Sequence, residues 1–169
     1  TTQADAAEEQ LSDMLADAAA LLTHGSAAAQ EGAAGQIAAL ALETTLSQPF
    51  HPLTFRNACV ERGIVDHLVR LLSPEARATN TALHHALAAL EAIATDDPTT
   101  DLDNDHARVV CTAGTVPHLV RLLEWTDEHL QLAAASCTAI LAACLECRAA
   151  LAARGAVAPL LRLATFGID

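Results

Sequence analysis

The most reactive side chains of the sequence are its five cysteines, of which Cys144 and Cys147 form a Cys-x-x-Cys pair. A structural zinc ion needs four ligands, and no second Cys-x-x-Cys or His-x-x-x-His follows to complete the set. Redox chemistry of the thioredoxin kind would place a strand before the pair, and the sequence predicts none there. We therefore predict that the cysteines are reduced, pack as small apolar residues in helix cores, and bind no metal or cofactor.

A second candidate for chemistry is an acidic segment in which Asp101, Asp103 and Asp105 have the alternate spacing that begins an EF-hand calcium loop. The pattern then breaks, because His106 stands where the loop needs glycine and Thr112 where it needs a bidentate glutamate. We predict a solvated acidic loop that faces solvent or a basic partner, and no calcium site.

Catalytic motifs are missing from the sequence. It has no Gly-x-x-x-x-Gly-Lys phosphate loop and no lysine, and its serine, histidine and acidic residues form no recognisable nucleophile set. The adjacent His84 and His85 point to neighbouring faces of a predicted helix, which argues against a shared metal. These observations predict that the segment is not an enzyme, and they leave open a catalytic domain elsewhere in a longer chain.

A sequence motif of ten residues, called here the glycine phrase, occurs three times and predicts the helices that position the residues described above. Each copy begins with glycine, carries apolar residues at +2, +5, +6, +8 and mostly +9, and has arginine at +7; the copies cover 63–72, 114–123 and 155–164. The apolar spacing predicts a helix with one buried face. The glycine predicts the left-handed turn that ends the helix before it.

The length of the unit indicates the kind of repeat. Gly114 and Gly155 are 41 residues apart, within the range of about 40–47 residues for armadillo and HEAT units. The phrase, with Pro117 at a second-helix position where proline is common in armadillo repeats, resembles the armadillo-repeat family over essentially the whole chain. The resemblance implies an all-α, right-handed solenoid of about three repeats plus the start of a fourth. The Ala- and Leu-rich composition agrees, since no segment alternates as a strand would.

The predicted helices divide the chain into four repeats. A degenerate first repeat covers 8–53, with helices over 8–23 and from Ser26 to about Leu46, the second of which Gly32 and Gly35 shorten or bend. The second repeat covers 54–105, with helices over 54–62, 64–72 and from 75 or 79 to 95, and an acidic insertion over 95–105. The third covers 106–145, with helices over 106–113, 116–125 and 127–145. A partial fourth covers 146–169, with helices over 147–154 and 157–166, and we expect a longer array because its last motif stops half complete.

Charge limits the choice of partner. The formal net charge is −12 and the first arginine is Arg56, which disfavours binding to nucleic acid and to anionic membranes. The most apolar run, 132–145, is shorter than the roughly 20 residues that span a bilayer. An odd number of cysteines without a signal peptide favours a reducing compartment, most simply the cytoplasm, with the nucleus or a cytoskeletal assembly as alternatives. We predict protein partners that are basic or apolar, within a larger complex or free.

The resemblance also implies a binding surface. In armadillo proteins the third helices line a concave groove, and peptide-binding members carry a tryptophan and, one turn later, an asparagine on each. Alignment by the glycine phrase puts other residues at these places, so the amide ladder is absent. The implied groove consists of Leu40, Thr44, His85, Ala88, Ala92, Ser136 and Ile140. An outer ladder of Arg70, Arg121 and Arg162 is the alternative surface, for an acidic partner.

The function that the resemblance implies is a non-catalytic scaffold or adaptor, which binds a peptide or a partner helix along the concave surface. A structural subunit built permanently into a large assembly is an alternative. An accessory repeat region of a larger regulatory enzyme is another.

Overall fold

The chain is all-helical in the computed structural model, which describes residues 3–46, 52–95 and 105–166 and has no strand within them. The α-helices are α1 Gln3–His24, α2 Ala27–Leu46, α3 Pro52–Glu61, α4 Ile64–Leu71, α5 Asn80–Ala94, α6 Asp105–Val110, α7 Val116–Leu122, α8 Glu128–Leu141, α9 Leu145–Ala153 and α10 Val157–Phe166. A 3-10 turn, η1 (Pro74–Ala76), precedes α5, and a kinked segment, η2 (Cys111–Thr115), joins α6 to α7, with non-helical backbone angles at Gly114. The all-α class predicted from the sequence is confirmed.

Three glycines turn the chain from one helix into the next. Gly63, Gly114 and Gly155 have φ angles of 66°, 94° and 82°, in the left-handed region. Other residues are strained in this conformation, since their Cβ atom approaches the backbone, so the turns favour glycine. Gly63 and Gly114 precede short helices with a buried apolar stripe, as the glycine phrase predicts. The prediction is wrong for the helix after Gly155, where Val157 and Leu161 are 52% and 61% exposed.

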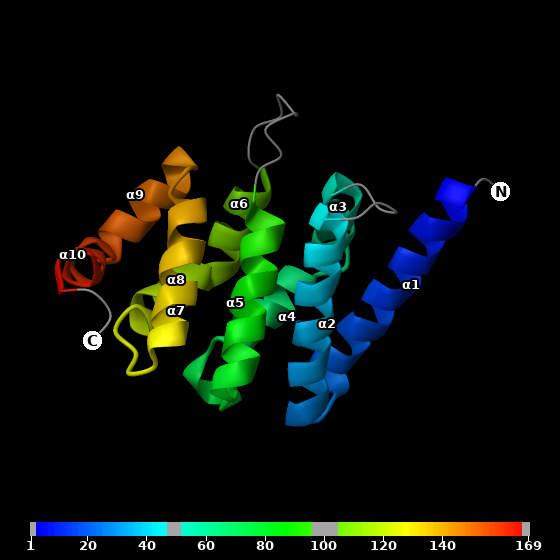
Figure 1. Cartoon of the computed structure of the whole chain (residues 1–169), viewed down its shortest axis with the longest axis horizontal. Coiled ribbons are helices and arrows are strands. Elements are labelled where there is room, and N and C mark those ends of the chain that lie inside the picture. Colours follow the sequence, from blue (N-terminus) through cyan, green and yellow to red (C-terminus); the bar gives the residue numbers. More distant parts are fainter. Residues whose placement is uncertain (1–2, 47–51, 96–104, 167–169) are drawn as a thin grey trace.

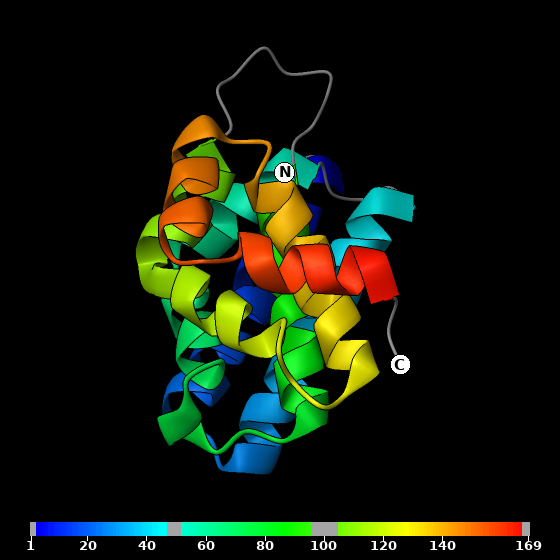
Figure 2. The ribbon, with the colours of Figure 1, turned by 90° about the vertical axis from the view of Figure 1, so that its left-hand side faces the viewer.

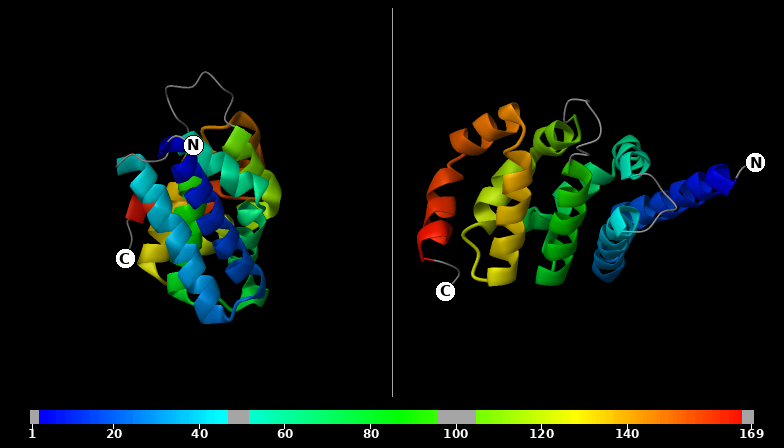
Figure 3. Two further views of the ribbon diagram at one scale, coloured as in Figure 1. Left: turned by 90° about the vertical axis from the view of Figure 1, so that its right-hand side faces the viewer. Right: turned by 45° about the horizontal axis from the view of Figure 1, so that its top comes forward.

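The helices form two layers along an elongated array. Helices α2, α5 and α8 stand side by side in one layer (Figure 1). The shorter helices α3, α4, α6 and α7 lie behind them, with α1 at one end and α9 and α10 at the other (Figures 1 and 3). Seen from the end at which α10 lies, the elements stack behind one another along the array (Figure 2). The arrangement is that of an α-solenoid, in which each unit packs on its neighbours.

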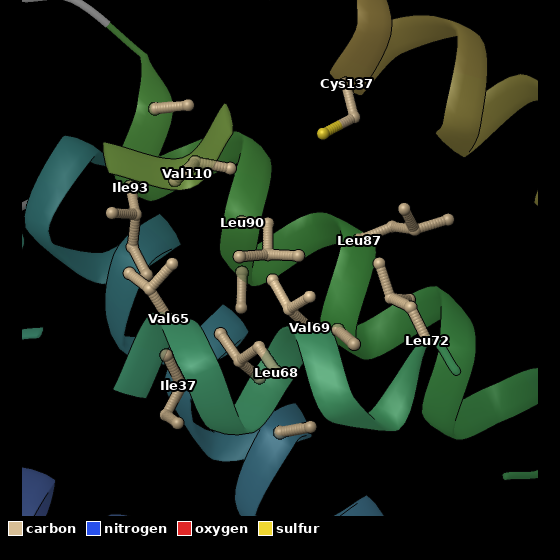
Figure 4. Packing of buried hydrophobic residues seen from close by; sticks show 14 of the residues in the cluster. Ile37, Val65, Leu68, Val69, Leu72, Leu87, Leu90, Ile93, Val110 and Cys137 are labelled. Carbon is tan, nitrogen blue, oxygen red and sulfur yellow. The ribbon is translucent and has the colours of Figure 1, made fainter. Parts of the chain in front are cut away.

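The core runs between the two layers and is made mainly of leucine and alanine. Figure 4 shows Val69 of α4 close to Leu90 of α5, and Leu68 of α4, Leu87 of α5 and Ile37 of α2 belong to the same cluster. All of these side chains are buried. Because alanine carries a single methyl group, the helices can approach closely without large side chains between them.

The first two helices differ from their predicted bounds. Helix α1 begins at Gln3 rather than at residue 8, and its acidic, alanine-rich start therefore belongs to the helix. Helix α2 runs without interruption from Ala27 to Leu46, so Gly32 and Gly35 neither shorten nor break it. Burial of Ala33, Ala34 and Ile37 against the core offsets the cost of the two glycines.

The junction between α8 and α9 also differs. The predicted third helix over 127–145 ends at Leu141, and the next helix starts at Leu145 rather than at residue 147. The Arg148 side chain donates hydrogen bonds to the carbonyl oxygens of Ala142 (2.9 Å) and Ala143 (3.4 Å), which satisfies groups left free where α8 ends. Most of the acidic insertion lies outside the described residues. The division into repeats stays a proposal, with α1–α2, α3–α5, α6–α8 and α9–α10 as units.

Candidate partner-binding face

The exposed and partly exposed side chains of α2, α5 and α8 form one continuous surface, which we call the α2–α5–α8 face. The N-cap residues of the three helices show which positions of α2, α5 and α8 are equivalent. The side chains of Ser26, Thr79 and Asp127 accept hydrogen bonds from backbone N–H groups three residues later, at 3.3, 3.0 and 3.1 Å. The sequence predicts this role for Ser26 and, as an alternative to Thr126, for Asp127. It gives Thr79 only as a possible start of the helix. Equal distance from these caps therefore identifies equivalent positions on the three helices.

This register corrects the assignment of Leu40 to the groove. Leu40 lies fourteen residues after its cap, as do Ile93 and Leu141, and all three are buried, with 6% of Leu40 exposed. Ala88 and Ser136 lie nine residues after their caps, and the equivalent residue of α2 is Gly35. Leu40 is therefore a core residue. The side chain of Thr44 lies outside the described residues.

The remaining predicted groove residues lie on this face. Ala88, Ala92, Ser136 and Ile140 are partly exposed on α5 and α8, and their small size leaves the surface shallow. Two large apolar side chains that the sequence analysis missed, Leu42 and Leu132, are 60% and 58% exposed on α2 and α8. The sequence could have indicated them, since both leucines fall outside the periodic positions that form the buried stripe of their helices.

Carboxylates cross the seams between neighbouring helices of the face. Thr79 donates a hydrogen bond to Glu31 across the α2–α5 seam. Across the α5–α8 seam, Ser136 donates to Glu91 (2.8 Å) and Asn80 donates to Asp127 (2.9 Å). Each donor is neutral, so the negative charge of the carboxylate is kept.

The charge of the face is therefore acidic. The sequences of α2, α5 and α8 contain no arginine or lysine. The pKa of Asp127 is lowered, first by the hydrogen bond from the Leu130 N–H and further by the Asn80 amide. Its carboxylate stays ionised at neutral pH, and the face offers acceptors to cationic groups.

His85, predicted to look into the groove, packs across the α2–α5 seam. A Cβ atom placed on Gly35 would lie 2.9 Å from Nδ1 and 3.0 Å from Cε1 of the His85 ring. Nδ1 is buried and has no hydrogen-bond partner within the described residues. The ring therefore fills the space that the missing side chain of Gly35 leaves, which makes His85 a packing residue of the seam.

The three arginines of the predicted outer ladder each have a partner. Arg121 donates a hydrogen bond to the Leu72 carbonyl at the end of α4, and its guanidinium lies 5.2 Å from the ring centroid of Trp125. Arg162 forms an ion pair with Glu124, just beyond α7. Arg121 therefore joins α7 to the end of α4, and Arg162 joins α10 to the end of α7.

Arg70 makes a local contact instead. It hydrogen bonds with Nδ1 of His67 in the same helix, and Nε2 of that histidine lies 3.1 Å from Thr23 Oγ1 of α1. Because Thr23 donates its own proton to the Ala19 carbonyl, its oxygen accepts from Nε2–H, which leaves Nδ1 as the acceptor for Arg70. Arg121 and Arg162 therefore link neighbouring units directly, whereas at Arg70 the contact to α1 is made by His67.

Three of the cysteines are core residues. Cys59, Cys137 and Cys147 are fully buried, and burial raises the pKa of the Cys59 and Cys137 thiols to about 12. All five cysteines are free thiols. Within the described ranges, no three His, Cys, Asp or Glu side chains come together in a way that could hold a metal ion.

Comparisons with known proteins support the fold. No family model and no curated protein matches the chain. An engineered protein solved by a structural genomics consortium has 29% identity and a TM-score of 0.73, and the match covers 89% of this chain and 55% of that one. A designed armadillo repeat protein in complex with the peptide (KR)4 has 23% identity and the same TM-score, with 94% and 66% covered.

The chain therefore has an armadillo-like repeat fold. It spans between half and two thirds of the length of these two structures. Among the described helices, none has both the length and the apolar character needed to cross a bilayer.

Proposed function

We propose that the chain is a non-catalytic protein-interaction module, whose α2–α5–α8 face binds a basic or apolar segment of a partner protein. The observation that carries the proposal is the combination of carboxylates and small residues on a face whose three helices lack arginine and lysine. A scaffold or adaptor role follows from it, and a cytoplasmic location stays a prediction from the cysteines.

The carboxylates at the seams give a physical reason for a basic partner. Glu31, Glu91 and Asp127 are oriented by neutral donors, so a lysine or arginine of the partner pairs with carboxylates that need no further ordering. The net charge of −12 attracts cationic partners over longer distances. Charge of this kind contributes more to specificity and association rate than to affinity.

Apolar contacts supply the rest of the binding energy. Leu42 and Leu132 present their side chains on the face, and the alanines Ala88 and Ala92 between them leave room for side chains of a ligand. Burial of exposed apolar area gives about 25 cal/mol per Å² before the costs of association. A segment that alternates basic and apolar residues would use both kinds of contact.

A structural neighbour suggests the basic peptide to use as a probe. The designed armadillo repeat protein carries the peptide (KR)4, which consists of alternating lysine and arginine. That binding belongs to the neighbour, whose 23% identity supports a shared fold alone. The present chain lacks tryptophan and asparagine at the aligned positions, so we expect it to hold side chains rather than to clamp the peptide backbone.

The test uses a fluorescent (KR)4 peptide and an acidic peptide of equal length in anisotropy titrations at two salt concentrations. We expect the basic peptide to bind and the acidic one not to, with weaker binding at high salt. Ala92→Arg places a cation and a long side chain in the face, and should weaken binding at least about tenfold. Glu91→Gln should weaken it up to about fivefold, the range of an exposed ion pair.

Matched variants on other surfaces are the controls. Glu146→Gln changes the charge equally on α9, and Arg70→Glu changes the outer ladder; both should leave (KR)4 affinity nearly unchanged. Circular dichroism confirms that each variant is folded. If Arg70→Glu alters binding and Ala92→Arg does not, the outer ladder is the binding surface and the proposal is wrong.

A further inference from the structure

The Cys144-x-x-Cys147 pair lies at the first turn of α9, a position that the sequence analysis did not assign to it. Cys144 is the N-cap residue, with extended backbone angles (φ −75°, ψ 129°) that place it outside the helix. Cys147 is three residues later, in the first turn. The Cys144 side chain makes no capping hydrogen bond to the helix. It lies near enough to Cys147 for the N–H and the thiol of that residue to shift its pKa.

Cys144 has the environment of a reactive thiol. Its side chain is partly exposed. The N–H group of Cys147 lowers the pKa of Cys144, and the Cys147 thiol and the Glu146 N–H lower it further, whereas partial burial and the Glu146 carboxylate oppose the shift. A helix N-terminus stabilises a thiolate through these N–H groups and the helix dipole, and the thiolate is the nucleophilic form.

Cys147 has the opposite environment. It is fully buried, and its S–H donates to the Ala107 carbonyl of α6 at 3.5 Å. Burial raises the pKa of Cys147, and interactions with the thiols of Cys144 and Cys111 raise it further. The structure thus holds a protonated thiol beside a thiol that ionises more easily. This pairing of unlike cysteines suits an oxidation in two steps.

We propose that Cys144 is a peroxide-reactive thiol and that Cys147 is the thiol that resolves its oxidised form as a disulfide. The proposal is independent of the binding function. In the first step the Cys144 thiolate attacks one oxygen of a hydroperoxide, the O–O bond breaks, and the products are a sulfenic acid and hydroxide, which takes up a proton. In the second step the Cys147 sulfur attacks the sulfenic sulfur, and the departing hydroxyl leaves as water with the Cys147 proton. The two thiols are oxidised by two electrons and the peroxide is reduced.

The local geometry allows the disulfide to close. Residues three apart on a helix have Cβ atoms about 5–6 Å apart, whereas a disulfide needs about 3.5–4.5 Å. Cys144 is the residue that has to move to bring the two Cβ atoms closer. Its backbone lies outside the helix, in the turn that joins α8 to α9. Closure also removes the S–H donor from the Ala107 carbonyl, so the reaction affects the contact between α9 and α6.

The experiment follows oxidation of the whole reduced chain by hydrogen peroxide. Samples are alkylated with iodoacetamide in denaturant, digested with trypsin and analysed by mass spectrometry. Because trypsin cuts after arginine, peptide 122–148 carries Cys137, Cys144 and Cys147, peptide 109–121 carries Cys111, and peptide 57–62 carries Cys59. We expect peptide 122–148 to change from three labels to one, on Cys137, while peptide 57–62 stays fully labelled.

Variants separate the roles of the two thiols. Cys144→Ser should slow the loss of labels at least about tenfold, because the thiolate is removed. Cys147→Ala should leave the first step intact and stop it at a sulfenic acid on Cys144, which dimedone traps. Cys137→Ala is the matched control, a buried cysteine of the preceding helix, and should oxidise like the wild type.

Three results would overturn the proposal. One is oxidation of Cys144→Ser at the wild-type rate. Another is a disulfide that joins peptide 109–121 to peptide 122–148, which would make Cys111 a member of the reactive pair. The third is loss of label from Cys59 as fast as from Cys144, which would mean that peroxide reaches the thiols through unfolding.

Discussion

Replacing Gly35 with alanine, in parallel with the same change at Gly32, tests the packing of α2 on α5. The two glycines are three residues apart on one helix, so the change in helix propensity is nearly the same for both. Their surroundings differ. A Cβ atom on Gly32 meets nothing within 4 Å, whereas one on Gly35 would lie 2.9 Å from Nδ1 of His85.

These distances predict different effects on the free energy of unfolding. Alanine is about 1 kcal/mol more favourable than glycine inside a helix, so Gly32→Ala should stabilise the protein by about that amount. Gly35→Ala gains the same term and pays for overpacking, which costs about 1–3 kcal/mol. The net effect at Gly35 is a loss of between about zero and 2 kcal/mol, and the two variants should differ by about 1–3 kcal/mol.

Urea unfolding followed by circular dichroism measures both variants under identical conditions. A second pair of variants, His85→Ala alone and His85→Ala combined with Gly35→Ala, completes a double-mutant cycle. In the His85→Ala background, Gly35→Ala should become stabilising, because the ring that it meets is gone. If Gly35→Ala stabilises the protein as much as Gly32→Ala while His85 is present, the ring does not lie on α2 and the seam is wrongly described.

Three further predictions concern other parts of the fold. Leu119→Ala empties a fully buried position and should cost about 2–5 kcal/mol in thermal unfolding, and a loss below about 1 kcal/mol would mean that the stripe of α7 is not buried. Gly114→Val should lower the melting temperature, because a β-branched residue is strained at a φ of 94°; an unchanged value would contradict the left-handed turn. Asp127 has a folded pKa below its ordinary value of 3.8, so its contribution to stability is present above that pH and lost as the pH falls through the folded pKa. Urea unfolding of Asp127→Asn, which keeps a capping oxygen, should lack this pH-dependent loss, and equal acid sensitivity of both proteins would contradict the assignment.

Much of the fold could be predicted because it is encoded locally. Gly63 and Gly114 adopt left-handed turns whatever packs around them, since glycine lacks the Cβ atom that makes this conformation costly. Thr79 and Asp127 cap their helices through their own side chains. Such signals lie within a few residues of the structure that they specify, and the sequence displays them directly.

The boundary between α8 and α9 could not be predicted in the same way. Ala142, Ala143 and Cys144 include no glycine or proline, and alanine favours continuation of the helix. The break depends on Arg148, which satisfies the carbonyl groups where α8 ends. Because the chain ends one helix and starts another there, Cys144 becomes an N-cap residue, and its chemistry follows from that position.

The candidate face was predicted in part. Ala88, Ala92, Ser136 and Ile140 lie on it, because the glycine phrase fixes the register of α5 and α8. The first repeat lacks that phrase, so alignment placed Leu40 five residues beyond the equivalent of Ala88, on the buried side of α2. Alignment by Ser26 gives the correct equivalence, since its hydroxyl caps α2 as that of Thr79 caps α5.

The left-handed turns at Gly63, Gly114 and Gly155 also bear on how far sequences with this architecture can diverge. A Cβ atom at each of these positions meets nothing within 4 Å, so the restriction there is one of chirality and not of volume. Among the other amino acids, asparagine enters the left-handed region most readily. Replacement of these glycines by asparagine during evolution should therefore remove the recognisable motif while the helices keep their arrangement. Related chains can then share this fold at low sequence identity.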